Sequence, residues 1–236
     1  MSKERKAYEQ IGVAMTCRSY DEYVRMFALR PELLQSGAVL DVAAGASSFV
    51  AEACGRGYDA RAADPLYALE PEAIRANGVR EIEASTAKLA AIREQFDWSY
   101  YGDVDRHRSN REASLERFAA HYEAERSNGR YVPAKLPRLP FESGEFSLVL
   151  VSHFLFLYHE QFDFDFHLAA LQELMRVCRR GGEVRIYPVI TLGWDRYPLL
   201  ERLSEALGRQ GIQASLPESS LPFIPGSKEL LRLAYE

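Results

Sequence analysis

The hydrophobic residues of the chain follow two periods that alternate along the sequence. Near the N-terminus, apolar side chains recur at helical spacing, at Tyr20, Tyr23, Val24, Phe27 and Ala28. Further on, short apolar runs predict buried strands at residues 38–40, 58–64, 146–151 and 183–190, with helical patterns between them. Strands that alternate with helices form a mostly parallel sheet covered on both faces. The pattern therefore predicts a doubly wound α/β fold.

One long segment interrupts this alternation. Residues 66–128 contain charge-rich helical patterns at 79–95 and 111–126, separated by the aromatic stretch "DWSYYGD". We expect a helical insertion after the second strand, with mostly solvated outer faces. No linker divides the chain, so we expect a single domain over residues 1–236 with an N-terminal helical lid over about 1–36.

The C-terminal half returns to the regular pattern. A helix over residues 167–180 is expected to end at Gly181–Gly182. A second helix is expected over 197–207, followed by strands at 211–215 and within "LLRLAYE".

Composition narrows the class of protein. The 236 residues carry a net charge of −5, with 47% hydrophobic and 27% charged residues, which is typical of a soluble globular enzyme. This charge argues against nucleic acid as a partner. The three cysteines form no CxxC pair, and no apolar run is long enough for a membrane. We expect a cytoplasmic protein with no metal centre and no membrane partner, and a homodimer remains open.

A loop of small residues carries the first chemical signal. The stretch "VLDVAAGASSF" ends a strand at Asp41 and continues into a helix through residues 43–47. Asp64 ends the next strand, 64 − 41 = 23 residues later. In such sheets, ligands bind beyond the carboxyl ends of the strands, where an acid at the second strand accepts hydrogen bonds from ribose hydroxyls. The two acids are therefore expected in one crevice that binds a nucleoside.

The glycine count separates two nucleoside ligands. NAD requires three glycines for its pyrophosphate, but Ser47 and Val50 stand where the second and third belong. Asp41 within the turn would repel a phosphate and attract a cationic amino group. S-adenosylmethionine (SAM) has a ribose, an ammonium group and no phosphate, so the pattern favours SAM.

Four segments in order resemble the motif series of class I SAM-dependent methyltransferases. They read "VLDVAAGASSF", "AADPLY", "LPFESGEFSLVLVSHF" and "ELMRVCRRGGEVRIYPV", and they span residues 38–190. The family's acid-x-Gly-x-Gly-x-Gly turn corresponds to Asp41, Ala43, Gly45 and Ser47. The resemblance implies a Rossmann-like, mostly parallel seven-stranded sheet with an antiparallel C-terminal strand, and the conversion of SAM to S-adenosylhomocysteine.

The resemblance also implies a set of site residues. The N-terminal helix resembles the lid that covers SAM in enzymes acting on small molecules, and residues after the strand of the third segment, which ends at Val151, face the methyl group. The expected cofactor-binding residues are Tyr20, Tyr23, Asp41, Ala43, Ala44, Gly45, Ser47, Asp64, Pro65, Leu66, Ser152 and His153. His153 and Tyr158 are the candidate catalytic residues, with His153 as base. The alternative for His153 is a hydrogen bond to neighbouring backbone or to the SAM carboxylate.

Three departures from the family pattern matter. Ala43 and Ser47 replace glycines, so we expect a negative φ at Ala43 and a helix cap at Ser47. The acid or amide that often contacts adenine should precede "LPF", where the chain reads "AKLPR". Either the backbone or a residue of the insertion then contacts adenine. The third departure is the insertion itself.

Missing motifs limit the methyl acceptor. The chain has no "NPPY" or "DPPY" after residues 146–151, no cysteine at a strand end, and no pair of acids with an amide near Ser152. Aromatic residues around 98–101 and 154–166 form either a pocket wall or core packing. We expect methyl transfer to oxygen or nitrogen of a small aromatic or apolar bacterial metabolite. The alternatives are 3-amino-3-carboxypropyl transfer from SAM and non-catalytic SAM binding.

Overall fold

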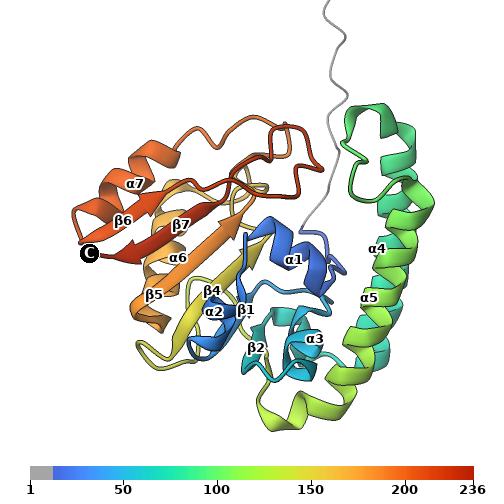
Figure 1. Cartoon of the computed structure of the whole chain (residues 1–236), viewed down its shortest axis with the longest axis horizontal. Coiled ribbons are helices and arrows are strands. Elements are labelled where there is room, and N and C mark those ends of the chain that lie inside the picture. The colour runs from blue at the N-terminus through green and yellow to red at the C-terminus, as the bar shows by residue number, and fades with distance from the viewer. Residues whose placement is uncertain (1–12) are drawn as a thin grey trace, which may run out of the picture.

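One mixed sheet of seven strands organises residues 13–236, the part of the chain that the computed structural model describes (Figure 1). The strands are β1 (Val39–Val42), β2 (Ala60–Ala63), β3 (Tyr131–Val132), β4 (Phe146–Ser152), β5 (Cys178–Tyr187), β6 (Ile212–Ser215) and β7 (Leu231–Tyr235). The α-helices are α1 (Tyr20–Met26), α2 (Pro31–Gln35), α3 (Phe49–Gly55), α4 (Pro71–Ala91), α5 (Val104–Glu125), α6 (Phe164–Val177) and α7 (Leu200–Gly208). The part of the expected lid over residues 1–12 lies outside the described residues.

The strand order is β3-β2-β1-β4-β5-β7-β6, and β7 is antiparallel to both of its neighbours. This confirms the predicted mostly parallel, Rossmann-like sheet. The order reverses direction between β1 and β4, where a doubly wound sheet forms its binding crevice. In both parallel ladders Val42 is paired, with Ala63 on one side and Val151 on the other. The loops that follow β1, β2 and β4 therefore start at the same level.

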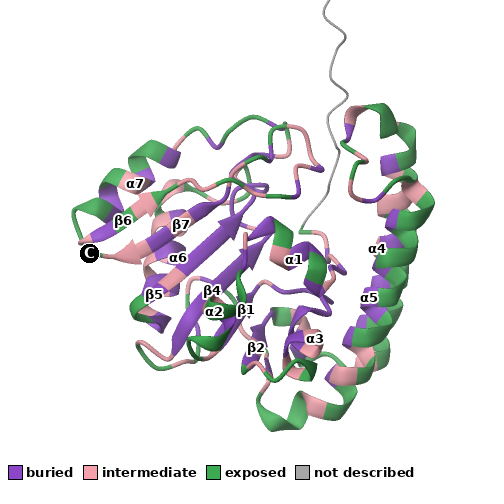
Figure 2. Cartoon of the chain, in the orientation of Figure 1, coloured by how far each residue is buried: buried purple, intermediate pink, exposed green. Residues whose placement is uncertain are grey.

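Alternate residues of the central strands contribute to two separate cores. In β4, Leu148 and Leu150 belong to the core that contains α1 and α3, while Val149 and Val151 belong to the core that contains α6 and α7. This follows from the two-residue period of a strand. Figure 2 shows the central strands buried along nearly their whole length. Among residues 13–236, no helix combines the length and hydrophobicity needed to cross a membrane.

The predicted helical insertion is the pair α4 and α5, which lie side by side along one edge of the molecule (Figure 1). Both helices begin earlier than the charge pattern predicted. Pro71 occupies the first turn of α4, where its missing N–H costs nothing, and the Asp103 side chain caps α5 by accepting from the Arg106 N–H. Their outward faces are exposed, as expected (Figure 2).

The expected helix end at Gly181–Gly182 is wrong. Helix α6 stops at Val177, and β5 already begins at Cys178, which pairs with Phe146. The register shifts before the next pair, so the two glycines form an irregularity inside the strand. A Cβ at Gly182 would lie 2.6 Å from the backbone oxygen of Ser147, so the close approach of β4 requires this glycine.

A buried ion cluster connects the insertion to the N-terminal part of the chain. The Glu22 side chain on α1 is fully buried, and Arg111 Nη1 on α5 lies 2.6 Å from each of its carboxylate oxygens. Arg18 Nη1 lies 3.3 Å from Oε1, and the Tyr101 hydroxyl also donates to it. Burial by itself raises the pKa of Glu22, but Arg111 and Arg18 outweigh it and lower that pKa to about 2.

Close packing of α4 on α5 generates the first prediction. A Cβ at Gly78 would lie 2.6 Å from Cδ1 of Leu115, a buried side chain, and 3.2 Å from Met15 Cε. Gly78→Ala should therefore lower the free energy of unfolding by about 1–3 kcal/mol, measured by chemical denaturation. Gly208→Ala is the control, because no atom lies within 4 Å of its Cβ position. A Gly78→Ala variant as stable as the parent would contradict this packing.

The ion cluster generates the second prediction. Glu22→Gln removes one partner of a buried pair and should cost about 3–5 kcal/mol of unfolding free energy at neutral pH. Because the folded pKa lies below the ordinary 4.5, the stabilisation is complete above pH 4.5 and is lost as pH falls toward 2. The difference between parent and variant should shrink over that window. Glu116→Gln, which removes an exposed pair with Arg75, should cost under about 1 kcal/mol. A difference that does not depend on pH would refute the assignment.

Candidate functional site

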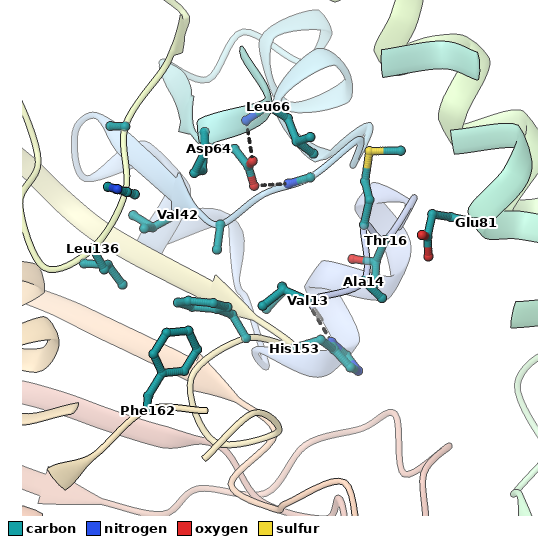
Figure 3. Close-up of a pocket in the computed structure, with 18 of the residues that line it drawn as sticks. Val13, Ala14, Thr16, Val42, Asp64, Leu66, Glu81, Leu136, His153 and Phe162 are labelled. Carbon is teal, nitrogen blue, oxygen red and sulfur yellow. Dashed lines mark hydrogen bonds between the residues drawn. The ribbon is translucent and has the colours of Figure 1, made fainter. Parts of the chain in front are cut away.

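A cavity of about 360 Å³ lies beyond the carboxyl ends of β1, β2 and β4 (Figure 3). Its walls come from the loops after these three strands, from the extended segment 13–16 before α1, and from residues 134–136. Asn77 and Glu81 of α4 and Phe166 of α6 also line it. This volume is within the usual range for a small-molecule site. Among residues 13–236, no group of three or more His, Cys, Asp or Glu side chains is arranged to hold a metal ion.

Seven of the residues expected to bind the cofactor line this cavity. They are Ala43, Gly45, Asp64, Pro65, Leu66, Ser152 and His153. They are distant in sequence, and the level ends of the three strands bring them together. The predicted positions of the strand ends therefore indicated correctly where the cavity lies.

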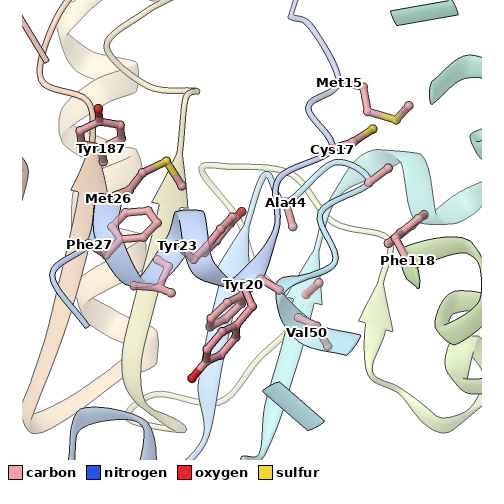
Figure 4. Packing of buried hydrophobic residues seen from close by; sticks show 14 of the residues in the cluster. Met15, Cys17, Tyr20, Tyr23, Met26, Phe27, Ala44, Val50, Phe118 and Tyr187 are labelled. Carbon is pink, nitrogen blue, oxygen red and sulfur yellow. The ribbon is translucent and has the colours of Figure 1, made fainter. Parts of the chain in front are cut away.

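The two expected lid tyrosines lie elsewhere, in the buried core between α1 and α3 (Figure 4). The Tyr20 and Tyr23 rings stack on Phe49, with centroid distances of 5.7 and 4.6 Å. They follow the apolar face of α1, which packs on α3 and not over the cavity. The segment 13–16 lines the cavity in their place, and its sequence, "VAMT", carries no helical or motif signal.

Asp41 also lies behind the cavity and does not line it. It is the third residue of β1, one residue inside the strand, and its side chain is fully buried. The Tyr23 hydroxyl donates to Asp41 Oδ1 over 3.2 Å, while Oδ2 has no partner among the described residues. Burial raises the pKa of Asp41 well above its ordinary value, and the hydrogen bond from Tyr23 opposes that effect only in part. Within residues 13–236 the printed partner of this carboxyl group is thus Tyr23 of α1, so Asp41 connects β1 to α1.

The small-residue loop is held by the protein's own backbone. Ala43 has a φ of +55°, so the expected negative φ is wrong. A Cβ at Gly45 would lie 3.0 Å from the Thr16 carbonyl oxygen, so the glycine accommodates segment 13–16. Ala44, within the same loop, is buried and does not line the cavity. Ser47 accepts from the first N–H of α3, at Phe49, over 3.1 Å and so satisfies a helix N–H as expected, although Ser48 is the N-cap.

Asp64 joins the ends of β1 and β2. Its Oδ2 accepts from the Gly45 N–H and its Oδ1 accepts from the Leu66 N–H, each over 2.9 Å (Figure 3). Burial raises its pKa, and these two bonds act in the opposite direction. A carboxylate oxygen has two lone pairs, so each oxygen can accept one further hydrogen bond from a ligand in the cavity. Glu81 supplies a second carboxylate from α4.

His153 follows β4 directly in a strained backbone conformation. Its φ is +51°, which costs a non-glycine residue about 1–2 kcal/mol. The His153 N–H donates to the Tyr187 oxygen over 2.7 Å, and its Nδ1 lies 2.9 Å from Ser152 Oγ. Burial, together with the charges of Arg18 and Arg111, lowers the pKa of His153 well below its ordinary value. The imidazole is therefore neutral at pH 7.

A second, smaller cavity of about 120 Å³ adjoins the first. The two share lining residues, namely Ala14, Met15, Thr16, Glu81 and His153. Tyr158 lines the second cavity, and its hydroxyl accepts from the Ala14 N–H over 2.9 Å. Tyr158 therefore fixes the segment that separates the cavities, a role its sequence position did not indicate.

The aromatic residues divide between walls and core. Phe154 and Phe162 line the first cavity, and Phe96 and Phe223 line the second. By contrast, Trp98 packs edge-on against Phe223 at 5.1 Å between centroids and lines neither cavity. The expected aromatic residues therefore serve in part as a pocket wall, as Phe154 and Phe162 do, and in part as core packing, as Trp98 does.

Two sequence comparisons match this chain. A sequence profile described as a methyltransferase domain matches residues 109–186. An uncharacterised protein of Methanocaldococcus jannaschii is 31% identical over 215 residues, which cover 91% of this chain and 92% of that protein.

Solved structures align with this chain at low sequence identity. The PH0226 protein of Pyrococcus horikoshii is 12% identical with a TM-score of 0.47, covering 92% of this chain and 91% of that one. Magnesium protoporphyrin IX methyltransferase of Synechocystis, crystallised with SAM, is 12% identical with a TM-score of 0.48. That match covers 92% of this chain and 78% of the Synechocystis protein. TnmH is 11% identical with a TM-score of 0.47. The match covers 91% of this chain and 55% of TnmH, so this chain spans about half the length of TnmH. From its profile match, strand order and motif series, the chain belongs to the class I SAM-dependent methyltransferases, which use SAM as methyl donor.

Proposed function

We propose that this methyltransferase acts as a single domain and methylates an oxygen or nitrogen atom of a small molecule. The observation that carries the proposal is the pair of adjoining cavities that share His153. The larger one has the size and strand-end position for SAM, and the smaller one has room for a compact acceptor. Helices α4 and α5 line the smaller cavity on one side, which favours a small acceptor over a macromolecular one.

The charges of the larger cavity support SAM as its occupant. Among residues 13–236, its lining contains the carboxylates of Asp64 and Glu81 and a single cation, Lys135. SAM carries a sulfonium and an ammonium against one carboxylate, so its net positive charge matches a negative lining. Asp64 would accept from the ribose hydroxyls with its remaining lone pairs. Residues 134–136 stand where the family places an adenine-contacting acid, so backbone groups would take that role.

His153 lies where the two cavities meet, and Ser152 lines the larger one beside it. When bound, SAM supplies a methyl group that its sulfonium already activates, so the protein's contribution is mainly positioning and the exclusion of water. A neutral His153 accepts the proton that an acceptor hydroxyl or amine loses. Its lowered pKa makes it a weak base, so positioning and the exclusion of water contribute more to the rate than proton transfer does. Tyr158 is a positioning residue, because it holds segment 13–16 over the site.

Asp64→Ala tests the ribose assignment. Losing two hydrogen bonds to a charged acceptor should weaken SAM binding roughly 100-fold in titration calorimetry. Asp64→Asn, which keeps the side chain's shape, should give a smaller loss in the same direction. The control is Asp59→Ala, because Asp59 is exposed at the opposite end of β2 and pairs with Arg130. Unchanged SAM affinity in a folded Asp64→Ala protein would rule out the assignment.

Product analysis tests the reaction and the acceptor class together. Incubation with SAM and the dialysable fraction of a cell extract should produce S-adenosylhomocysteine, detected by mass spectrometry, and the retained macromolecules should support none. Methylthioadenosine as product would instead indicate aminocarboxypropyl transfer. Methyl label that enters only the macromolecular fraction would contradict a small acceptor.

A further inference from the structure

The smaller cavity is bordered by more buried positive charge than buried negative charge. Arg18 is 8% exposed, Arg111 is 5% exposed and Glu22 is fully buried. Both guanidinium groups border the cavity and share this one carboxylate. An unpaired buried charge is costly, so a site of this kind gains from an anionic ligand.

The unequal bonding of the two arginines identifies the surplus charge. Arg111 contacts both oxygens of Glu22 at 2.6 Å and also donates to the Tyr101 hydroxyl and the Cys17 carbonyl, over 3.0 and 3.2 Å. Arg18 makes one longer contact of 3.3 Å to Glu22, and its Nε–H has no partner among the described residues. Glu22 therefore neutralises Arg111, and Arg18 is left with most of its charge and donors available.

His107 adds a second unpartnered donor on the same wall. Its Nε2 lies 3.2 Å from Arg111 Nη2, and a guanidinium only donates, so Nε2 accepts and the proton of the neutral ring is on Nδ1. Burial and the charge of Arg111 lower the pKa of His107 to about 2, which keeps the ring neutral. Nδ1 is buried without a partner among the described residues. Both unpartnered groups are donors, so this wall of the cavity has positive charge and donor character that no acceptor within residues 13–236 balances.

The rest of the lining specifies the body of the ligand. Apolar side chains predominate around the cavity, including Leu89, Phe96, Leu157, Trp194 and Phe223. Glu22 lies behind the arginines, and Glu81 is the acidic residue that lines the cavity itself among residues 13–236. It is half-exposed, borders the larger cavity as well, and forms no ion pair within residues 13–236, so it does not neutralise Arg18.

We infer, building on the proposed function, that the methyl acceptor is a carboxylate with an apolar, ring-sized body, and that Arg18 binds its carboxylate group. The apolar body packs among the aromatic residues of the smaller cavity. This arrangement brings the ligand next to His153, which lines both cavities. Arg18 is thus a specificity residue, selecting anionic acceptors over their neutral and cationic counterparts.

Calorimetry with matched ligands tests this inference. The probes are phenylacetate and indole-3-acetate, their two amides, and phenethylamine, each titrated with and without saturating S-adenosylhomocysteine. The carboxylates should bind at least roughly tenfold more tightly than the amides, and the amine should bind most weakly. Arg18→Gln should abolish the preference, and Arg18→Lys should retain part of it. Arg117→Gln, which changes an exposed arginine of α5, should leave it unchanged.

Arg18→Gln should fold, because Glu22 keeps its closer partner Arg111, and a thermal melt verifies this. Equal binding of carboxylates and amides would overturn the inference. So would the absence of carboxylate binding at millimolar concentration, or a preference that survives in Arg18→Gln. A protein that fails to bind S-adenosylhomocysteine would refute the proposed function instead, since the carboxylate preference is also measured without it.

Discussion

The buried Glu22 carboxylate is the interaction on which the arrangement of the site depends. Through Arg111 it fixes α5, and through Arg18 it fixes the segment that crosses the strand ends. Among residues 13–236, this cluster supplies the buried ion pairs that join the insertion to the N-terminal part of the chain. Because charges in a low-dielectric interior interact strongly, a single carboxylate with two guanidinium groups both holds the fold and leaves residual positive charge. The same contacts therefore shape the smaller cavity and set its charge.

The strand ends and the cavity could be predicted from the sequence because they depend on local signals. Apolar runs gave the strands, and the acid after a strand gave Asp64, which lines the cavity with the loop residues Ala43 and Gly45. A loop of small residues and an acid at the strand ends are typical of parallel sheets that bind a nucleoside. Prediction succeeded where backbone geometry by itself determines position.

The remainder of the site depends on contacts between distant segments, which the sequence does not encode locally. Tyr20 and Tyr23 have the spacing of a lid helix, but both rings stack on Phe49 of α3. They therefore fill the core and do not cover the site. Segment 13–16 has no periodicity, yet it lines both cavities because Tyr158 and Gly45 hold it. The glycine pair after α6 resembled a helix end but serves the close pairing of β4 and β5.

His153, which lines both cavities, is buried and has a strained backbone conformation. Its left-handed backbone and neutral imidazole are maintained by the Tyr187 carbonyl and by nearby positive charge, and such strained residues concentrate at functional sites.

The most direct test of the site is a crystal structure with S-adenosylhomocysteine bound. The ribose hydroxyls should lie within hydrogen-bond distance of the Asp64 carboxylate, with the sulfur directed toward His153. A nucleoside bound elsewhere, or bound in this cavity with its ribose away from Asp64, would contradict the assignment of the site.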